Sequence, residues 1–375
     1  MSADLPVRPE LRDAVPYGAP QLDVPVRLNT NENPYPPPPE VVAAAAQAVR
    51  GCVAGLNRYP DREASALRAD LAAYLRSDSG VTVDASAVWA ANGSNEVMVQ
   101  LLQAFGGPGR LAMAFAPTYS MYPEYARDTF TDWAVGQRAP DFTLSAADAA
   151  AQVRALRPDV VFLASPNNPT GTALPPKTVV AVYEATSGIV VVDEAYAEFR
   201  RSGTPSALTL LAGRPRLVVT RTMSKAFAFA GARVGYAAAD PALIEALRVV
   251  RLPYHLSSVT QAVARVALAH APALQRDIER LRRTRDDLVT WLRARGLVVP
   301  DSDANFVLVG PFENRHAIWQ GLLAGGVLVR EVGPPEWLRV TVGTEEEVAA
   351  FRSALVALGD TATAATPRPA EEAMT

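Results

Sequence analysis

The sequence predicts an α/β protein whose mostly parallel central sheet is covered by helices on both faces, followed by a smaller α+β domain. Between residue 34 and about residue 250, short apolar runs alternate with stretches of helical periodicity. Strands that are apolar on both faces and separated by helices are typical of parallel sheets buried on both sides. Five runs carry this pattern: VWAAN (88–92), LAMAF (111–115), DVVFLAS (159–165), GIVVVDEA (188–195) and RLVVTRT (216–222).

The pattern divides the 375 residues into four segments. Residues 1–33 form an extended arm, because five prolines between positions 6 and 25 prevent regular helix. Residues 34–255 form the large domain, in which the YPPPP stretch precedes a helix that begins near Glu40. Residues 256–360 form the small C-terminal domain. Residues 361–375 are small, polar and proline-containing, which predicts a disordered tail.

Within the small domain, apolar side chains recur at helical spacing from Leu274 to Leu292, with arginines on the opposite face. The segments GLVVP, ANFVLVG, GVLVRE and WLRVTVG predict short strands. The last segment, TEEEVAAFRSAL, predicts a closing helix, because Thr344 and Glu347 have the spacing of a capping box.

Composition excludes several classes of partner and site. Thirty-six Lys and Arg against 39 Asp and Glu give a net charge of -3, without the cationic excess that nucleic acid or an anionic membrane attracts. The single cysteine, Cys52, and three dispersed histidines lack metal-ligand spacing, so no metal is expected. The chain has neither an apolar run of about 18 residues nor an N-terminal signal segment, which predicts a cytoplasmic protein.

Functional groups in a parallel sheet gather at the ends of its strands. The loops that follow two of the predicted strands have sequences that suggest ligand contacts. The NGSNE segment at 92–96 opens a helix whose first N–H groups attract a phosphate; alternatively, Ser94 simply caps the helix. The SPNNPTG segment at 165–171 is a rigid loop whose paired asparagines favour an amide that faces a ligand. Ordinary turn chemistry also explains its prolines and glycine.

Two further strand ends carry ionisable groups. Asp193 ends a fully apolar strand, where a buried carboxylate needs a cationic partner such as a protonated pyridine nitrogen, unless it caps the next helix. Lys225 follows another strand and is a candidate amine nucleophile; a surface lysine near a turn is the alternative. Thr222, Ser224 and Arg233 suit a phosphate monoester, and Gly231 and Gly235 would let the backbone come close.

Together these groups match the needs of one ligand. An acid for a pyridinium, an amine for an aldehyde and two sets of phosphate donors are what pyridoxal 5'-phosphate requires. They fall at successive strand ends, as a single site in an open sheet demands. The expected cofactor is therefore pyridoxal 5'-phosphate.

The chain resembles the fold-type-I pyridoxal-phosphate aminotransferases (class II) from about Leu5 to Leu358. The motifs that carry the resemblance are SPNNPTGT, VVDEAYAEF and RTMSKAFAFAGARVGY. Four more motifs (RLNTNENPYPPP, LNRYPD, APTYSMY and WLRVTVGTEEE) are similar to the branch that acts on histidinol phosphate. The resemblance implies the pyridoxal-phosphate transferase fold of type I, with a mostly parallel sheet and a smaller α+β domain.

The resemblance also implies roles for individual residues. Lys225 would form the imine with the cofactor and later carry a proton between the substrate's α-carbon and the cofactor. Asp193 would keep the pyridine nitrogen protonated, and Tyr119 would stack on the ring. Asn168 and Tyr196 would hydrogen-bond the phenolic oxygen. The implied phosphate ligands are Ser94, Asn95, Thr222, Ser224 and Arg233, joined by Tyr59 from the second subunit of a homodimer.

Two arginines are implied to bind small-molecule substrates. Arg339 would take the α-carboxylate of glutamate, and Arg330 the phosphate of histidinol phosphate or the distal carboxylate of glutamate. Without the resemblance, the alternating pattern places Arg339 on the polar face of a strand. Tyr17 and Asn31, on the arm, would close over the site.

The implied reaction is transamination between L-histidinol phosphate/imidazole-acetol phosphate and L-glutamate/2-oxoglutarate, in histidine biosynthesis. The main alternative is an aromatic amino-acid aminotransferase that uses the same site. A related decarboxylase and a cofactor-sensing regulator are weaker alternatives, and the arm is too short to hold a DNA-binding domain. Ala228 and Ala232 stand where many family members have Gly and Leu.

Overall fold

Seven strands form the central sheet of a computed structural model that describes residues 5–359. Their order is β2-β8-β7-β6-β5-β3-β4. Neighbours from β7 through β4 run parallel, whereas β8 is antiparallel to both β7 and β2. The strands are β2 (Val88–Ala91), β3 (Leu111–Ala116), β4 (Asp132–Gln137), β5 (Val160–Ala164), β6 (Ile189–Asp193), β7 (Leu217–Thr222) and β8 (Gly235–Ala239).

Each of the five apolar runs contains one strand, and the predicted mostly parallel sheet is confirmed. Two strands had no clear sequence signal. Edge strand β4 has several exposed residues, so its pattern is mixed. Strand β8 reads GYAAA, and alanine has little strand preference.

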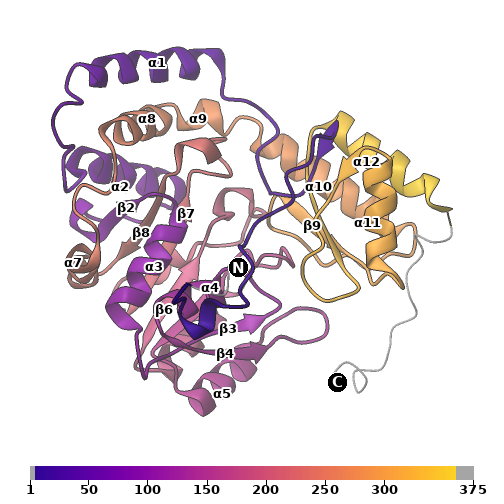
Figure 1. Ribbon diagram of the computed structural model, residues 1–375, viewed down its shortest axis with the longest axis horizontal. Coiled ribbons are helices and arrows are strands. Elements are labelled where there is room, and N and C mark those ends of the chain that lie inside the picture. The colour runs from indigo at the N-terminus through magenta and orange to yellow at the C-terminus, as the bar shows by residue number, and fades with distance from the viewer. Residues whose placement is uncertain (1–4, 360–375) are drawn as a thin grey trace.

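Helices cover both faces of the sheet, as Figure 1 shows. Alternate residues of β5 enter two separate apolar clusters: Val161 and Leu163 join one, Val160 and Phe162 the other. The first cluster includes side chains from α2, α5, α6 and α8, and the second from α3, α4 and α7. The helices are α1 (Pro39–Val53), α2 (Ser65–Ser79), α3 (Ser94–Phe105), α4 (Tyr122–Asp128), α5 (Ala146–Leu156), α6 (Pro176–Ala185), α7 (Pro241–Val250) and α8 (Ser258–Ala269).

The C-terminal part forms a second body, shown in orange and yellow in Figure 1. Strands β9 and β11 pair antiparallel, and the capping box of Thr344 and Glu347 is confirmed. The GLVVP segment forms only the isolated bridge between Val298 and Gly310, not a strand. Its elements are α10 (Ile278–Arg293), β9 (Phe306–Val309), α11 (Arg315–Ala324), β10 (Val327–Leu328), β11 (Leu338–Thr341) and α12 (Glu345–Ala357). The short helix α9 (Ala271–Leu274) still packs in the cluster of the large sheet.

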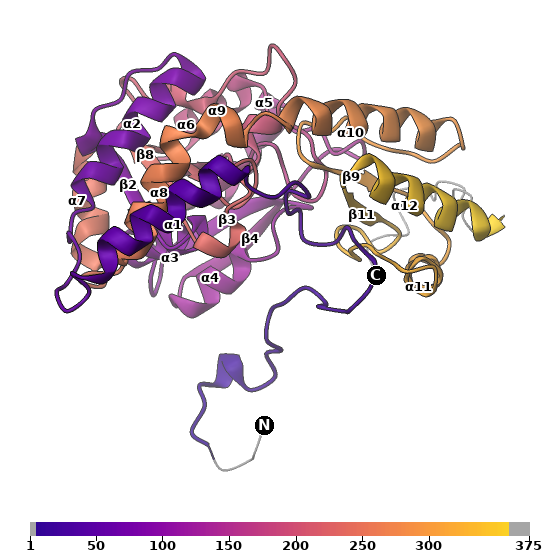
Figure 2. The same cartoon turned by 90° about the horizontal axis from the view of Figure 1, so that it is seen from above.

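The N-terminal arm is tied to this second body. Its short strand β1 (Val26–Arg27) pairs parallel with β10, and Figure 2 shows the preceding residues projecting from the side of the molecule. Five 3-10 helices complete the secondary structure of the described residues: η1 (Pro9–Leu11), η2 (Ala85–Ala87), η3 (Ala197–Phe199), η4 (Ala207–Leu210) and η5 (Ala230–Ala232).

The change from one core to the other occurs within α10. Leu281 belongs to the cluster of the large sheet, whereas Leu288 packs in the core of the second body. The predicted domain boundaries stay a prediction, and the predicted tail at 361–375 lies outside the described residues. Within residues 5–359, no helix has the length and apolar character needed to cross a membrane.

Candidate active site

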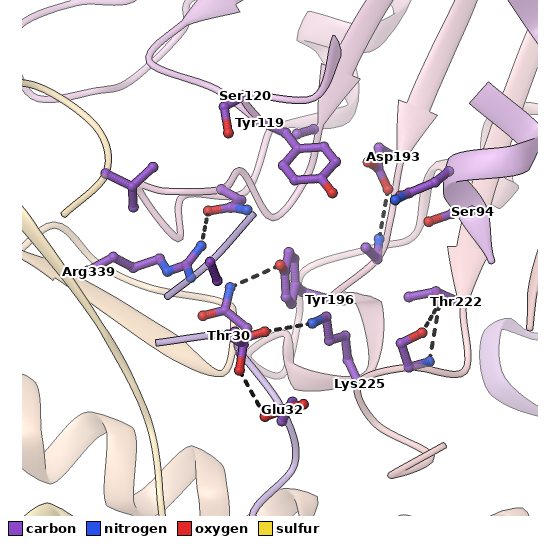
Figure 3. Close-up of a pocket in the computed structure, with 18 of the residues that line it drawn as sticks. Thr30, Glu32, Ser94, Tyr119, Ser120, Asp193, Tyr196, Thr222, Lys225 and Arg339 are labelled. Carbon is purple, nitrogen blue, oxygen red and sulfur yellow. Dashed lines mark hydrogen bonds between the residues drawn. The ribbon is translucent and has the colours of Figure 1, made fainter. Parts of the chain in front are cut away.

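A cavity of about 260 Å³ lies at the edge of the sheet where β5, β6 and β7 end, and the arm and the second body complete its wall. Figure 3 shows Asp193 and Ser94 on one side, Arg339 on the opposite side, and Tyr196 and Lys225 between them. All but one of the residues expected from the sequence line this cavity. They are Tyr17, Asn31, Ser94, Asn95, Tyr119, Asn168, Asp193, Tyr196, Thr222, Ser224, Lys225, Arg233, Arg330 and Arg339.

Asp193 is the last residue of β6 and is buried. Its Oδ2 accepts a hydrogen bond from the Tyr122 hydroxyl at 2.8 Å, and its Oδ1 accepts one from the Ala195 N–H at 3.2 Å. Burial raises the pKa of this carboxyl to about 6, although the Tyr122 hydrogen bond opposes the rise. Asp193 is therefore a buried anion near neutral pH, suited to a cationic group in the cavity.

Lys225 extends from the loop after β7, and its Nζ donates to the Thr30 carbonyl at 3.0 Å. Burial lowers the pKa of this amine to about 8, and the positive charge of Arg339 adds to the effect. Near neutral pH, a minor fraction of such an amine is unprotonated and nucleophilic, far more than for an ordinary lysine. Thr30 lies within the RLNTNENPYPPP motif, but this contact uses its backbone oxygen, so its residue type did not indicate it.

The loop between β2 and α3 forms an anion cradle. Gly93, not Ser94, is the N-cap residue of α3, so the alternative that Ser94 caps this helix is wrong. The Glu96 carboxylate accepts the Asn92 N–H instead. The first N–H groups of a helix have no acceptor within it, which leaves those of Ser94 and Asn95 to bind an anion.

Two glycines allow close approaches around this cradle. A Cβ on Gly235 would collide with the Ser94 amide, and a Cβ on Gly93 would collide with the Arg233 guanidinium. Gly231 does not have the expected close approach, since a Cβ there would meet nothing within 4 Å. Gly235 therefore allows β8 to pack directly against the backbone at the start of α3.

The remaining phosphate candidates converge on the same place. Arg233 Nη1 donates to Ser224 Oγ at 3.1 Å, and Thr222 Oγ1 donates to Ser224 Oγ at 3.0 Å. Arg233 is held in a left-handed conformation at φ 55°. Two hydroxyls, one guanidinium and the helix N-terminus provide a donor set that suits a phosphate monoester.

The paired asparagines have different surroundings. Asn167 is fully buried and hydrogen-bonds Thr118, the Pro117 carbonyl and Thr170, so it fixes the loop. Asn168 lines the cavity, and its Oδ1 accepts a hydrogen bond from Arg339. Ordinary turn chemistry thus explains the first asparagine but not the second.

Asn31 joins the arm to both bodies. It adopts a left-handed conformation at φ 55°, and its Nδ2 donates to the Tyr196 hydroxyl at 3.0 Å. Its backbone N–H and its Oδ1 both contact the Thr341 hydroxyl, and its carbonyl accepts from Asn305. Asn31 therefore connects the arm to Tyr196 and to the second body, and closure of the arm over the cavity stays a prediction.

The two candidate substrate arginines lie side by side across an antiparallel bridge. Arg339 is buried, which rules out the alternative of a solvent-facing strand position. It donates to Asn168 Oδ1 at 2.7 Å and to the Asn29 carbonyl at 2.6 Å, both neutral acceptors, and its Nε has no partner within the described chain. Arg330 donates to the Gly18 carbonyl, next to Tyr17 on the arm. Burial lowers the pKa of Arg339 to about 10.

Tyr59 is the one expected residue that does not line the cavity. Its side chain is 78% exposed and stacks on Tyr254. Among the residues that the sequence did not single out, Tyr122, Thr30 and Glu32 hydrogen-bond within the site, and Glu32 accepts from the Thr30 hydroxyl. Tyr122 ends the APTYSMY motif, and its spacing from Tyr119 around a helix start is a signal that could have indicated it.

The sequence matches the family model for class I and II aminotransferases over residues 24–355. It is 62% identical to a histidinol-phosphate aminotransferase of Thermobifida fusca, over 94% of this chain and 95% of the relative. It is 60% identical to histidinol-phosphate aminotransferase 3 of Burkholderia lata, over 94% and 96% of the two chains.

Solved structures share the fold. A histidinol-phosphate aminotransferase of Sinorhizobium meliloti in complex with pyridoxal-5'-phosphate superposes with a TM-score of 0.81 at 23% identity, covering 94% of this chain and 97% of the other. An aspartate aminotransferase of Thermus thermophilus with maleate gives a TM-score of 0.77 at 25% identity, covering 90% and 91%. The predicted fold is therefore confirmed.

Proposed function

Because the chain belongs to the class I and II aminotransferases, we propose that it transfers an amino group between L-histidinol phosphate and 2-oxoglutarate, in histidine biosynthesis. The products are imidazole-acetol phosphate and L-glutamate. The observation that carries this proposal is the cavity itself, in which a lysine amine with a lowered pKa lies with a buried carboxylate and a buried arginine that has only neutral partners. The names of the most similar relatives support the choice of substrate.

Pyridoxal 5'-phosphate fits the residues present. The first N–H groups of α3, with the Ser224 and Arg233 donors beside them, suit its phosphate, and buried Asp193 suits a protonated ring nitrogen. When bound, this cofactor supplies an aldehyde that reacts with amines and a ring that accepts electrons. Its phosphate would be held by Ser94, Asn95, Thr222, Ser224 and Arg233.

Lys225 has two tasks in this proposal. Its ε-amine would bind the cofactor covalently and, once the substrate's amine has replaced it, would take the proton from the substrate carbon that bears the amine. A pKa of about 8 suits both tasks, because the group can accept and return a proton close to neutral pH. The Thr30 carbonyl would hold the released amine in place.

The ring would be positioned by three further residues. Tyr119 would stack on it, and Asn168 and Tyr196 would donate to its phenolic oxygen. Tyr196 is itself held by the Asn31 amide, so the arm sets the direction of this hydroxyl. Asn168 presents its Oδ1 to Arg339, which leaves its NH2 group as the donor.

Arg339 and Arg330 would bind the two substrates in turn. Arg339 would receive the α-carboxylate of glutamate, since a buried guanidinium with an unpartnered Nε is a strong donor for a carboxylate. Arg330, nearer the arm, would receive the phosphate of histidinol phosphate or the distal carboxylate of glutamate. Tyr17 and Asn31 would cover the bound substrate.

We also propose that the protein acts as a homodimer. Tyr59 lies amid exposed apolar side chains, and its phenol is free to reach a second copy's phosphate cradle. The apolar neighbours in sequence and at the end of α7 are Val53, Leu56, Val249, Leu252 and Tyr254. Sedimentation of the purified protein tests the assembly, and Tyr59→Phe should weaken cofactor binding if the phenol reaches the partner's site.

Half-reactions test the proposed substrates. Glutamate added to the cofactor-loaded protein should shift its visible absorption, and imidazole-acetol phosphate should restore it. Phenylpyruvate provides the comparison, because the aromatic alternative shares every proposed cofactor contact. Faster recovery with phenylpyruvate would contradict the proposed substrate. Arg330→Ala should raise the KM for both the phosphate substrate and glutamate, and unchanged KM values would remove Arg330 from the proposal.

A further inference from the structure

Tyr122 is a buried aromatic residue that links two walls of the cavity. It is the first residue of α4, is fully buried, and its hydroxyl donates to Asp193 Oδ2 at 2.8 Å. Its ring stacks on Phe162, with centroids 4.7 Å apart, and meets the Tyr119 ring edge-on at 5.4 Å. Tyr122 does not itself line the cavity, so any effect on a ligand acts through Asp193 or Tyr119.

The Asp193 carboxylate is held by donors from opposite directions. The turn after β6 provides the Ala195 N–H to Oδ1, and the Thr220 hydroxyl on β7 lies at 3.5 Å from the same atom. Only Tyr122 donates to Oδ2 among the described residues. Without that donor, Oδ2 has no fixed partner and the carboxylate plane can rotate.

We propose that Tyr122 is a positioning residue whose hydroxyl fixes the Asp193 carboxylate as the acceptor for the cofactor's protonated ring nitrogen. The inference rests on the proposed function in one respect, namely that the ligand is pyridoxal 5'-phosphate. Tyr122 and Tyr119 form one aromatic unit, so the same helix start orients both the ring-stacking side chain and the acid.

The electrostatics of Asp193 support this role. The hydroxyls of Tyr122 and Thr220 contact it, and the other titratable groups near it are the carboxylate of Glu194 and the phenols of Tyr119, Tyr125 and Tyr196. Burial raises the pKa of Asp193, whereas the Tyr122 hydrogen bond lowers it. Loss of the hydroxyl would thus let Asp193 take up a proton at a higher pH and lose the charge that holds a pyridinium.

Tyr122→Phe tests the proposal, because it removes one oxygen and keeps the ring stacking. Tyr74→Phe is the matched control: Tyr74 is also buried and donates to a buried carboxylate, Glu198, at 3.0 Å, away from the cavity. In equilibrium dialysis of the full chain, Tyr122→Phe should weaken pyridoxal 5'-phosphate binding by about tenfold or more, the effect of one charge-assisted hydrogen bond. Tyr74→Phe should leave the affinity unchanged.

Two further measurements separate positioning from general loss of stability. The pH at which bound cofactor is lost on acidification should be higher in Tyr122→Phe than in the wild type. In a double-mutant cycle with Asp193→Asn, Tyr122→Phe should have little additional effect on affinity, because the carboxylate it acts through is gone. Additive losses, or an unchanged affinity and pH midpoint, would overturn the proposal. Failure of the wild type to bind the cofactor would instead overturn the proposed function.

Discussion

Two buried arginines in this protein have opposite surroundings. Arg221, on β7, contacts Glu194 at 2.9 Å and Asp78 at 2.6 Å, with Glu198 at 3.8 Å. Burial acts to lower its pKa, but these carboxylates outweigh burial and hold the pKa well above its usual range. Arg339 has only amide and carbonyl oxygens as partners, and burial lowers its pKa.

This difference distinguishes an arginine whose charge is paired within the fold, Arg221, from one whose charge is available to a ligand, Arg339. In the Arg221 network the cation faces three carboxylates, and Glu194 is also met by Arg200, Ser206 and the Ala207 N–H. The cavity has a surplus of cations: Lys225, Arg233, Arg330 and Arg339 face only Asp193 and Glu32. A buried cation without a counterion is costly, and an anionic cofactor and anionic substrates would compensate that cost.

Replacing each arginine by glutamine tests this distinction, with the largest effect at Arg221. Arg221→Gln leaves buried Glu194 without its closest cation, which should lower the free energy of unfolding by about 3–5 kcal/mol. Arg339→Gln should lower it by only about 1 kcal/mol, because the loss of two hydrogen bonds to neutral acceptors is offset by removal of a buried charge that has no counterion. Urea unfolding of both variants measures the two values. Equal losses would mean that both arginines are structural.

The second effect concerns binding and should appear only at Arg339. Arg339→Gln removes the proposed partner of the glutamate carboxylate, at a cost of about 1.5–3 kcal/mol, so the KM for glutamate should rise about tenfold to a hundredfold. Steady-state kinetics with glutamate and 2-oxoglutarate measure this change. A variant with wild-type KM values would show that the surplus charge of Arg339 does not serve these substrates.

The smallest effect is the influence of Arg339 on its neighbour Lys225. The unprotonated amine is the reactive form, so the rate of covalent cofactor uptake should rise with pH and level off above a midpoint near 8. Because the Arg339 charge lowers the pKa of Lys225, Arg339→Gln should move that midpoint upward by less than about one pH unit, or about 1.4 kcal/mol.

Stopped-flow absorbance follows this uptake. Lys225→Ala, measured over the same range, separates noncovalent binding and the cofactor's own titration from the reaction of the amine. A wild-type midpoint near the ordinary lysine value would contradict the assigned environment of Lys225.

The groups at strand ends could be predicted from the sequence. Asp193 ends the apolar strand β6, and Lys225 lies in the short loop after β7, so the two strands place both groups at the same edge of the sheet. Lys225 has an additional signal in the composition: of the 36 basic residues, only Lys177 and Lys225 are lysines. Arginine cannot act as an amine nucleophile, which distinguishes position 225 from the many arginines.

The contacts across the cavity could not be predicted in the same way. The Thr30 carbonyl accepts from Lys225 although the two residues are 195 positions apart in the sequence. Because every residue has a backbone carbonyl, the residue type at position 30 does not indicate this contact. Arg339 alternates with Leu338 and Val340, which suggests a solvent-facing side chain. Strand β11 is buried on both faces because the arm covers the other side, and that covering is a tertiary contact.

A covalent bond between Lys225 and pyridoxal 5'-phosphate is the central claim, and the chain provides its own control. Borohydride reduction of the cofactor-loaded protein, followed by peptide mass spectrometry, should locate a reduced cofactor on Lys225 and leave exposed Lys177 unmodified. Modification of Lys177 alone, or of neither lysine, would contradict the account.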